Sequence, residues 1–227
     1  QISPVRSAMV RLPMSRLGVK PPDFIIYGGL ESRKVSRFVD PSTEEIWAHS
    51  FDYEIFRSLR NNTSKISDTA VFIDEFLPSH PDLASRGQAA PIPPEYYYKR
   101  LRCFFDEVES ETGLRVIIAA CPRANYTDIP EAFGAREIVF HQTGRLIGES
   151  RLVLAHRSTA IGYAVMFRRP IIQFALKEIL NHVNHRIPLL AYADALGSRI
   201  VNLDDENRRP LKVPDKLDDR IYEDFMM

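Results

Sequence analysis

The chain has 227 residues, with 30 Lys and Arg against 30 Asp and Glu, so its formal net charge is zero, and 44% of its residues are hydrophobic. This is the composition of an ordinary globular protein, and at a prior of about 150 residues per domain the length suits one domain and part of a second. Balanced charge argues against broad binding to nucleic acid or to an anionic membrane, because both require a net basic surface.

Cysteine content and hydropathy bear on the compartment. Cys103 and Cys121 both stand in apolar surroundings and form neither a disulfide framework nor a zinc motif. No stretch approaches the roughly 18 apolar residues of a membrane span, and the N-terminal segment lacks the apolar core of a signal peptide. We therefore expect a cytoplasmic protein with at most peripheral association with the inner face of a membrane. Because the chain begins with Gln1 rather than Met, we also expect further sequence upstream.

The first 64 residues are expected to form a partial or small α/β portion. The run Asp23–Tyr27 is apolar with β-branched residues and ends at Gly28 and Gly29, which predicts a buried strand entering a tight loop. Residues Pro41–Trp47 carry a helix-start or strand-entry signal. The polar segment Arg60–Lys65 is expected to connect this portion to a second domain over residues 65–227.

From Thr69 onward, apolar runs of strand length alternate with amphipathic runs of helix length, which predicts a parallel α/β sheet. Pro94 is expected to start a helix that ends at Gly113. The other predicted elements are strands at Ala70–Ile73, Arg115–Ala120 and Glu137–Phe140, followed by a helix capped by Thr143.

The segment 151–174 reads as one compact βαβ unit. A strand at Leu152–Ala155 leads through the turn His156–Thr159 into a helix at Ala160–Phe167, with Ser158 or Thr159 as its N-cap. Such a turn lies at the carboxyl edge of a sheet, where open α/β folds bind ligands and where free N–H groups favour phosphate. A plain N-cap is an equally good interpretation of the two hydroxyls. Beyond Phe174 the pattern is helical through Leu196, and the tail from Asp204 is expected to wrap the surface.

A resemblance to a known family extends this interpretation. The run of Leu152-Val153-Leu154-Ala155-His156-Arg157-Ser158-Thr159, followed one helix later by Arg169-Pro170-Ile171-Ile172, resembles the nucleotide-sugar-binding half of GT-B glycosyltransferases, in which an H-x-S-T turn precedes a KP-I-I strand. The likeness is greatest to bacterial enzymes of surface-polysaccharide and capsule assembly. It covers roughly residues 68–174 and implies a Rossmann-like parallel sheet flanked by helices, of the GT-B C-terminal domain type.

The resemblance also implies a nucleotide site. Its candidate residues lie at strand ends and in the following turns: His80, Pro122, Arg123, Thr143, His156, Arg157, Ser158 and Thr159. In the resembling enzymes a strand ends in His-Pro, whereas here the equivalent dipeptide is Cys121-Pro122. A thiol cannot replace a cationic imidazole, so either Arg123 or His80 compensates, or the site has lost its chemistry. His80 is otherwise a solvated loop residue beside a turn-forming proline.

Three acidic residues are candidate catalytic groups. Asp74 and Glu75 end the first strand of the sheet, and Asp52 is the competing candidate from the N-terminal portion. Any of them could accept a proton from an acceptor hydroxyl, although a structural or solvated acid is the more frequent role. His182 and His185 lie three residues apart on a predicted helix and are interpreted as surface residues.

The sequence thus predicts a glycosyltransferase that moves a sugar, such as a CMP-linked one, from a nucleotide donor to a saccharide acceptor, without metal or further cofactor. Two alternatives remain open. One is a non-catalytic nucleotide-binding or assembly protein with a degenerate site, and the other is a polyol-phosphate transferase or nucleotide-sugar epimerase of the same architecture. Neither the donor sugar nor the oligomeric state follows from the sequence.

Overall fold

The computed structural model describes residues 18–35, 39–61, 65–208, 210–211, 213 and 218–226, and the chain divides into two compact units after Ser50. Residues 62–64 of the connection expected at 60–65, and parts of the expected C-terminal wrap, lie outside the described residues. Helix α3 (Phe51–Leu59), which carries Asp52, belongs to the second unit.

The first unit contains a small parallel sheet. Strands β1 (Phe24–Tyr27) and β2 (Glu44–Trp47) pair in parallel, and helix α2 (Leu30–Val35) connects them. Tyr27 is buried and its ring lies 5.3 Å from that of Trp47. The prediction that β1 is a buried strand was wrong for two of its residues, because Phe24 and Ile26 are exposed. Apolar composition identified the strand correctly but not how much of it a two-stranded sheet can cover.

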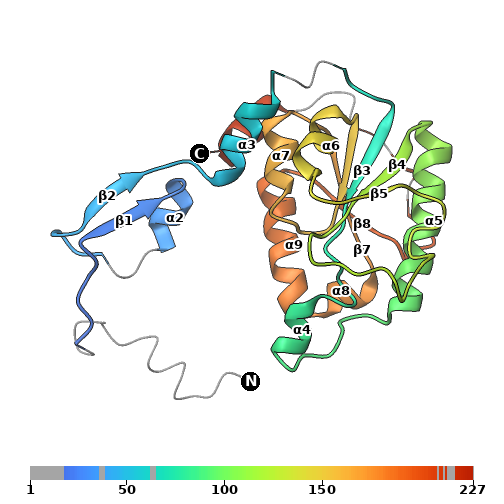
Figure 1. Cartoon of the computed structure of the whole chain (residues 1–227), viewed down its shortest axis with the longest axis horizontal. Coiled ribbons are helices and arrows are strands. Elements are labelled where there is room, and N and C mark those ends of the chain that lie inside the picture. The colour runs from blue at the N-terminus through green and yellow to red at the C-terminus, as the bar shows by residue number, and fades with distance from the viewer. Residues whose placement is uncertain are drawn as a thin grey trace. The chain divides into compact units, whose positions relative to one another are not determined.

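The second unit is an α/β fold around a six-stranded, all-parallel sheet (Figure 1), which confirms the predicted parallel architecture. The strand order is β5-β4-β3-β6-β7-β8. The strands are β3 (Thr69–Ile73), β4 (Arg115–Ala119), β5 (Ile138–Val139), β6 (Leu152–Ala155), β7 (Ile171–Ala175) and β8 (Ile200–Asn202). In chain order, β4 and β5 are added on one side of β3, and β6, β7 and β8 are then added on its other side. This is the Rossmann-like order, and it places the reversal of strand order between β3 and β6.

Helices cover both faces of the sheet, so its central strands are apolar throughout rather than alternating. On β3, Ala70 and Phe72 pack toward α5 (Pro94–Thr112), whereas Val71 and Ile73 pack toward α6 (Thr143–Glu149) and α7 (Ile161–Met166) (Figure 1). The remaining helices are α4 (Pro81–Ser85), α8 (Lys177–Asn181), α9 (Val183–Ala195) and α10 (Asp219–Met226).

The limits of α5 agree with the sequence. Pro94 is the first helical residue, and Gly113 ends the helix in the left-handed conformation with φ of 70°. The region after Phe174 differs from its prediction, because the helix is interrupted at His182 and the strand β8 follows it. Three residues of moderate hydrophobicity gave too short a signal to predict that edge strand.

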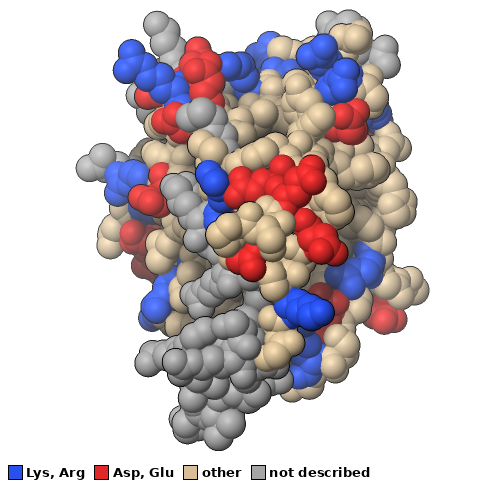
Figure 2. Space-filling model, turned by 90° about the vertical axis from the view of Figure 1, so that its left-hand side faces the viewer, with Lys and Arg blue, Asp and Glu red and all other residues tan. Residues whose placement is uncertain are grey.

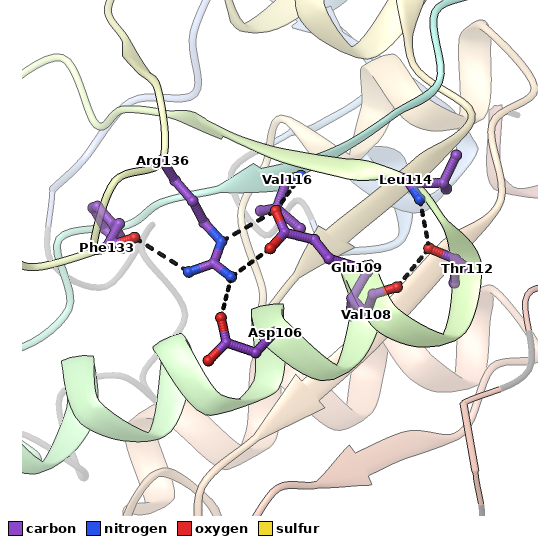
Figure 3. A network of polar contacts seen from close by, with 8 residues as sticks. All are labelled: Asp106, Val108, Glu109, Thr112, Leu114, Val116, Phe133 and Arg136. Carbon is purple, nitrogen blue, oxygen red and sulfur yellow. Dashed lines mark hydrogen bonds and ion pairs between the residues drawn. The ribbon is translucent and has the colours of Figure 1, made fainter.

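An ionic network fixes the far end of the long β4–β5 connection (Figure 3). Arg136 donates to Glu109 at 2.6 Å and to Asp106 at 2.5 Å, and only 10% of its side chain is exposed. Glu109 in turn accepts a hydrogen bond from the backbone N–H of Val116 at 2.9 Å. The network therefore joins α5, β4 and the connection that carries Tyr126 toward the carboxyl edge of the sheet.

Basic and acidic side chains are interspersed on the face of the molecule shown in Figure 2, and no broad basic area is visible there. Among the described residues, no helix is both long and apolar enough to cross a bilayer.

Candidate functional site

A cavity of about 990 Å³ opens at the carboxyl edge of the six-stranded sheet. The ends of β3 and β4 line it, together with the turns that follow β3, β4 and β6 and the first turn of α9. It therefore lies over the point where the strand order reverses, which is where open parallel α/β sheets bind their ligands. The sequence-predicted residues that line this cavity are Asp74, Glu75, His80, Pro122, Thr143, Arg157, Ser158 and Thr159.

Asp74 is a buried acid whose carboxylate bonds to Tyr126 and interacts with the backbone N–H groups of Phe76 and Cys121. Its Oδ2 accepts a hydrogen bond from the Tyr126 hydroxyl, whereas its buried Oδ1 has no hydrogen-bond partner among the described residues. Burial raises the pKa of Asp74 to about 6, although the hydrogen bond from Tyr126 opposes this rise. Asp74 therefore exchanges a proton near neutral pH, as a general base must.

Glu75 lies beside Asp74 but has a different environment. Its Oε1 accepts a hydrogen bond from the backbone N–H of Arg157 at 2.8 Å, and its Oε2 lies 3.7 Å from the Arg157 Nε. Burial raises the pKa of Glu75, whereas the Arg157 charge lowers it. The acid therefore holds the β6–α7 turn against the end of β3.

The β6–α7 turn presents Arg157, Ser158 and Thr159 to the cavity. Neither hydroxyl is the helix N-cap, because α7 starts at Ile161, one residue later than predicted, and Ala160 holds the N-cap position. Instead, the Ser158 Oγ accepts a hydrogen bond from the Ala160 N–H at 3.2 Å within a tight turn. The small residues after Thr159 favoured a helix in the sequence, but the local turn takes precedence there.

His156 lies in the core rather than along the cavity. It is fully buried, its Nδ1 lies 2.7 Å from the Phe174 carbonyl oxygen, and its Nε2 lies 3.0 Å from the Tyr97 hydroxyl. Burial lowers its pKa to about 4, so the imidazole is neutral at physiological pH. In this position His156 ties β6 to β7 and to α5.

His80 and Arg123 form one side of the rim. His80 caps α4, because its Nδ1 accepts the Asp82 N–H at 3.2 Å, and its Nε2 lies 3.1 Å from Arg123 Nη2. Arg123 pairs with Asp82 at 2.8 Å and does not line the cavity itself. Asp82 therefore already partners the arginine that was expected to compensate for Cys121.

Cys121 and Pro122 line the cavity at the end of β4. Cys121 is buried, and burial raises the pKa of its thiol. The group is therefore a neutral thiol at pH 7 and supplies no positive charge to a ligand.

The β5–α6 turn also lines the cavity. Thr143 is the first residue of α6 rather than its cap, and the N-cap position belongs to Gln142. The preceding His141 adopts a φ of 58°, and Phe76, one residue after Glu75, adopts a φ of 49°. Left-handed conformations are strained for such side chains and concentrate at functional sites. His141 and Phe76 follow strands β5 and β3, whereas a third such residue, Arg168 with φ of 53°, follows α7 and does not line the cavity.

Asp52 lies on α3 and accepts a hydrogen bond from the hydroxyl of Tyr163 at 2.8 Å. Tyr163 lines the cavity, but Asp52 does not. The structure thus places Asp52 behind a lining residue, and Asp74 and Glu75 at the cavity itself.

Sequence reasoning missed the histidines of α9. His182 and His185 both line the cavity, and the prediction of two surface histidines was wrong for His185, which is 8% exposed. A signal was present, because Leu189 and Ala193 continue the same helix face at a spacing of four and are buried. Among the described residues, no group of His, Cys, Asp and Glu is arranged to hold a metal ion.

Comparison with protein-family models and with curated proteins finds no match to this chain.

Proposed function

We propose that this protein is a glycosyltransferase of GT-B type whose nucleotide-sugar donor binds in the cavity at the carboxyl edge of the sheet. The observation that carries the proposal is the meeting of a buried, partly unpartnered carboxylate, Asp74, with the hydroxyl and arginine turn of Ser158, Thr159 and Arg157 in one cavity. The resemblance of residues 68–174 to the donor-binding half of such enzymes supports the same interpretation.

In this proposal the turn after β6 holds the donor phosphate. Hydroxyl and backbone N–H donors of Ser158 and Thr159 face the phosphate oxygens, and Arg145, which also lines the cavity and pairs with Glu149 at 3.0 Å, adds positive charge. These groups stabilise the negative charge that develops on the departing nucleotide. No metal ion is needed for that step, because the donors and the arginine supply the counter-charge.

Asp74 is the proposed general base. Its Oδ2 is held by Tyr126, so its unpartnered Oδ1 is available to accept the proton of an acceptor hydroxyl. Glu75 is the weaker candidate, because its oxygens already face the backbone N–H and the guanidinium of Arg157.

A second candidate function is a nucleotide-binding protein without transferase activity. Cys121 favours it, because the neutral thiol stands where the resembling enzymes carry a histidine, and Arg123 is paired with Asp82. A polyol-phosphate transferase would use the same phosphate-binding turn. The two enzyme classes are therefore distinguished by which nucleotide the reaction releases.

The testing experiment is a thermal-shift panel of CMP, CDP, UDP, GDP and dTDP with the parent protein and the Ser158→Ala/Thr159→Ala variant. A ligand that binds only the folded state raises the melting temperature. We expect one nucleotide to stabilise the parent selectively and the double variant to lose that shift. The matched control is Ser85→Ala/Thr127→Ala, which removes two exposed hydroxyls away from the cavity lining. Equal shifts in all three proteins, or none at all, would refute the proposal.

A further inference from the structure

The first turn of α9 lines the same cavity, and neither the predicted site nor the proposed donor site uses it. Its residues His182, Asn184 and His185 line the cavity. Helix α9 has 13 residues, and its N-cap residue His182 makes no capping hydrogen bond through its side chain. The N–H of His185 bonds to the His182 carbonyl oxygen at 2.9 Å, so the free donors of this end of α9 are the N–H groups of Val183 and Asn184, which lie at the positive end of the helix dipole.

A second observation points to a ligand at this place. His185 is 8% exposed and lines the cavity, its ring lies 4.7 Å from that of His182, and its buried Nδ1 has no hydrogen-bond partner among the described residues. A buried polar atom without a partner costs free energy unless a ligand or water satisfies it. His185 is therefore a buried polar side chain at the cavity wall whose ring lacks its expected partner.

Arg157 adds a third unsatisfied donor. Its Nε is buried and makes no hydrogen bond, since the Oε2 of Glu75 lies 3.7 Å away. Arg157 and His185 line the same cavity, and burial together with the smaller effects of the Arg157 and His182 charges lowers the pKa of His185 to about 4. Glu75 offsets part of this charge, but its Oε1 is already occupied by the Arg157 backbone N–H.

The chemistry of these groups selects the ligand. The guanidinium N–H and backbone N–H groups only donate hydrogen bonds, and a neutral imidazole can donate through one nitrogen. Convergent donors require a group that accepts without donating, which describes the oxygens of a phosphate or a carboxylate. A sugar hydroxyl would satisfy such a set less completely, because it brings a proton of its own.

We propose that the first turn of α9, with His185 and Arg157, forms a second anion subsite that binds a phosphate or carboxylate group of the substrate. The identity of that substrate rests on the proposed function. Two sources share this chemistry, namely a second phosphate of the donor nucleotide and an acidic group on the transferred or accepting sugar. The subsite predicts that the complete substrate carries at least two anionic groups, one at the Ser158–Thr159 turn and one at α9.

The test follows the imidazole signals of the full chain by NMR while inorganic phosphate, and separately glucuronate, is added. His185 is identified as the signal missing from the His185→Gln variant. We expect a saturable shift of this signal and a rise in the pKa of His185, because a bound anion favours the imidazolium form. We expect the apparent affinity for phosphate to fall at least tenfold in Arg157→Gln. The control His49→Gln changes a histidine of the first unit and should leave the apparent affinity for phosphate unchanged.

Nucleotides then distinguish the two sources. If CDP moves the His185 signal and CMP does not, the subsite takes the second donor phosphate. If glucuronate moves it in the presence of CMP, the subsite takes a sugar carboxylate.

The proposal is overturned if neither phosphate nor glucuronate moves the signal at tens of millimolar. If CMP or CDP still stabilises the protein through Ser158 and Thr159 in that case, the proposed function stands and only this subsite fails. Conversely, a phosphate shift at His185 without nucleotide binding keeps the subsite and refutes the donor class.

Discussion

Glu75 and Arg157 join the two strands between which the strand order reverses: the Glu75 carboxylate accepts the Arg157 backbone N–H at 2.8 Å. Glu75 follows β3 and Arg157 follows β6, so this bond spans the two loops that diverge at the cavity. It anchors the start of the Ser158–Thr159 turn to the end of β3, and it holds the Arg157 backbone beside Glu75.

Replacing Arg157 with Gln should destabilise the protein, because it leaves the Glu75 charge buried without its counter-ion. We expect a loss of about 2 kcal/mol in the free energy of unfolding at pH 8, below the range for fully buried pairs. The loss should shrink toward pH 5, where Glu75, whose pKa burial already raises, can take up a proton. Urea denaturation at both pH values measures it.

The matched control for that variant is Arg151→Gln. Arg151 pairs with Asp68 at 3.0 Å, but both side chains are more than half exposed. Such surface pairs contribute less than about 1 kcal/mol. Equal losses in the two variants would show that the Arg157 charge does not compensate Glu75.

Asp74→Asn should change how stability depends on pH. The pKa of Asp74 in the folded state is about 6, above its ordinary value of 3.8, so folding favours the protonated acid. The stability that this group contributes is therefore complete below about pH 4 and is lost as the pH rises to about 6, at roughly 1.4 kcal/mol per unit. The parent protein should lose on the order of 3 kcal/mol relative to Asp74→Asn across this window. Parallel urea titrations of the two proteins between pH 4 and pH 7 would reveal it, and a constant difference would contradict the raised pKa.

Tyr97→Phe should destabilise the core through His156. The variant keeps the aromatic ring but removes the hydroxyl that lies 3.0 Å from the buried His156 Nε2. An unsatisfied buried nitrogen costs about 1 to 3 kcal/mol. Tyr96→Phe is the control, because its hydroxyl bonds to Asp204 at 2.7 Å at an exposed position and should matter less. Chemical denaturation of both variants gives the comparison, and an equal effect would argue against the buried His156 contact.

Two glycines should respond in opposite directions to added side chains. Gly162 lies in α7, and a methyl group added there would meet no atom within 4 Å, so Gly162→Ala should stabilise the protein by roughly 0.5 to 1 kcal/mol. At Gly144, a Cβ would already lie 3.2 Å from both Leu59 and Tyr163, so Gly144→Val should destabilise by about 2 kcal/mol through overpacking. Thermal unfolding of the two variants tests the packing of α3, α6 and α7.

The sheet could be predicted from the sequence because its central strands are short, wholly apolar runs between recognisable helix limits. Pro94 and Gly113 delimit α5 through backbone restraints that act within a few residues. The edge strand β8 and the exposed residues of β1 could not be predicted this way. Their state depends on which other segments pack against them, and local composition does not contain that information.

The site was predictable to the extent that topology determines it. Residues that end parallel strands meet at one edge, so Asp74, Glu75 and the Arg157–Thr159 turn could be grouped in advance. Three features depended on tertiary contacts: the burial of His156, the pairing of Arg123 with Asp82, and the position of His185 at the cavity. The four-residue spacing of His185, Leu189 and Ala193 indicates that His185 is buried, but spacing does not show which side chains line the cavity.

The central place of β3 has a consequence for biosynthesis. This strand is the first of its sheet to be made, and its residues 70–73 are all buried in the finished sheet, yet Ala70 pairs with Leu152, which is 82 residues later in the chain. At about 5 to 20 residues per second, the ribosome takes several seconds or more to supply that partner. Throughout this interval one edge of a wholly apolar strand lacks its neighbour and can pair with other nascent chains. We therefore expect the yield of folded protein to depend on translation speed and on chaperones that cover the nascent chain.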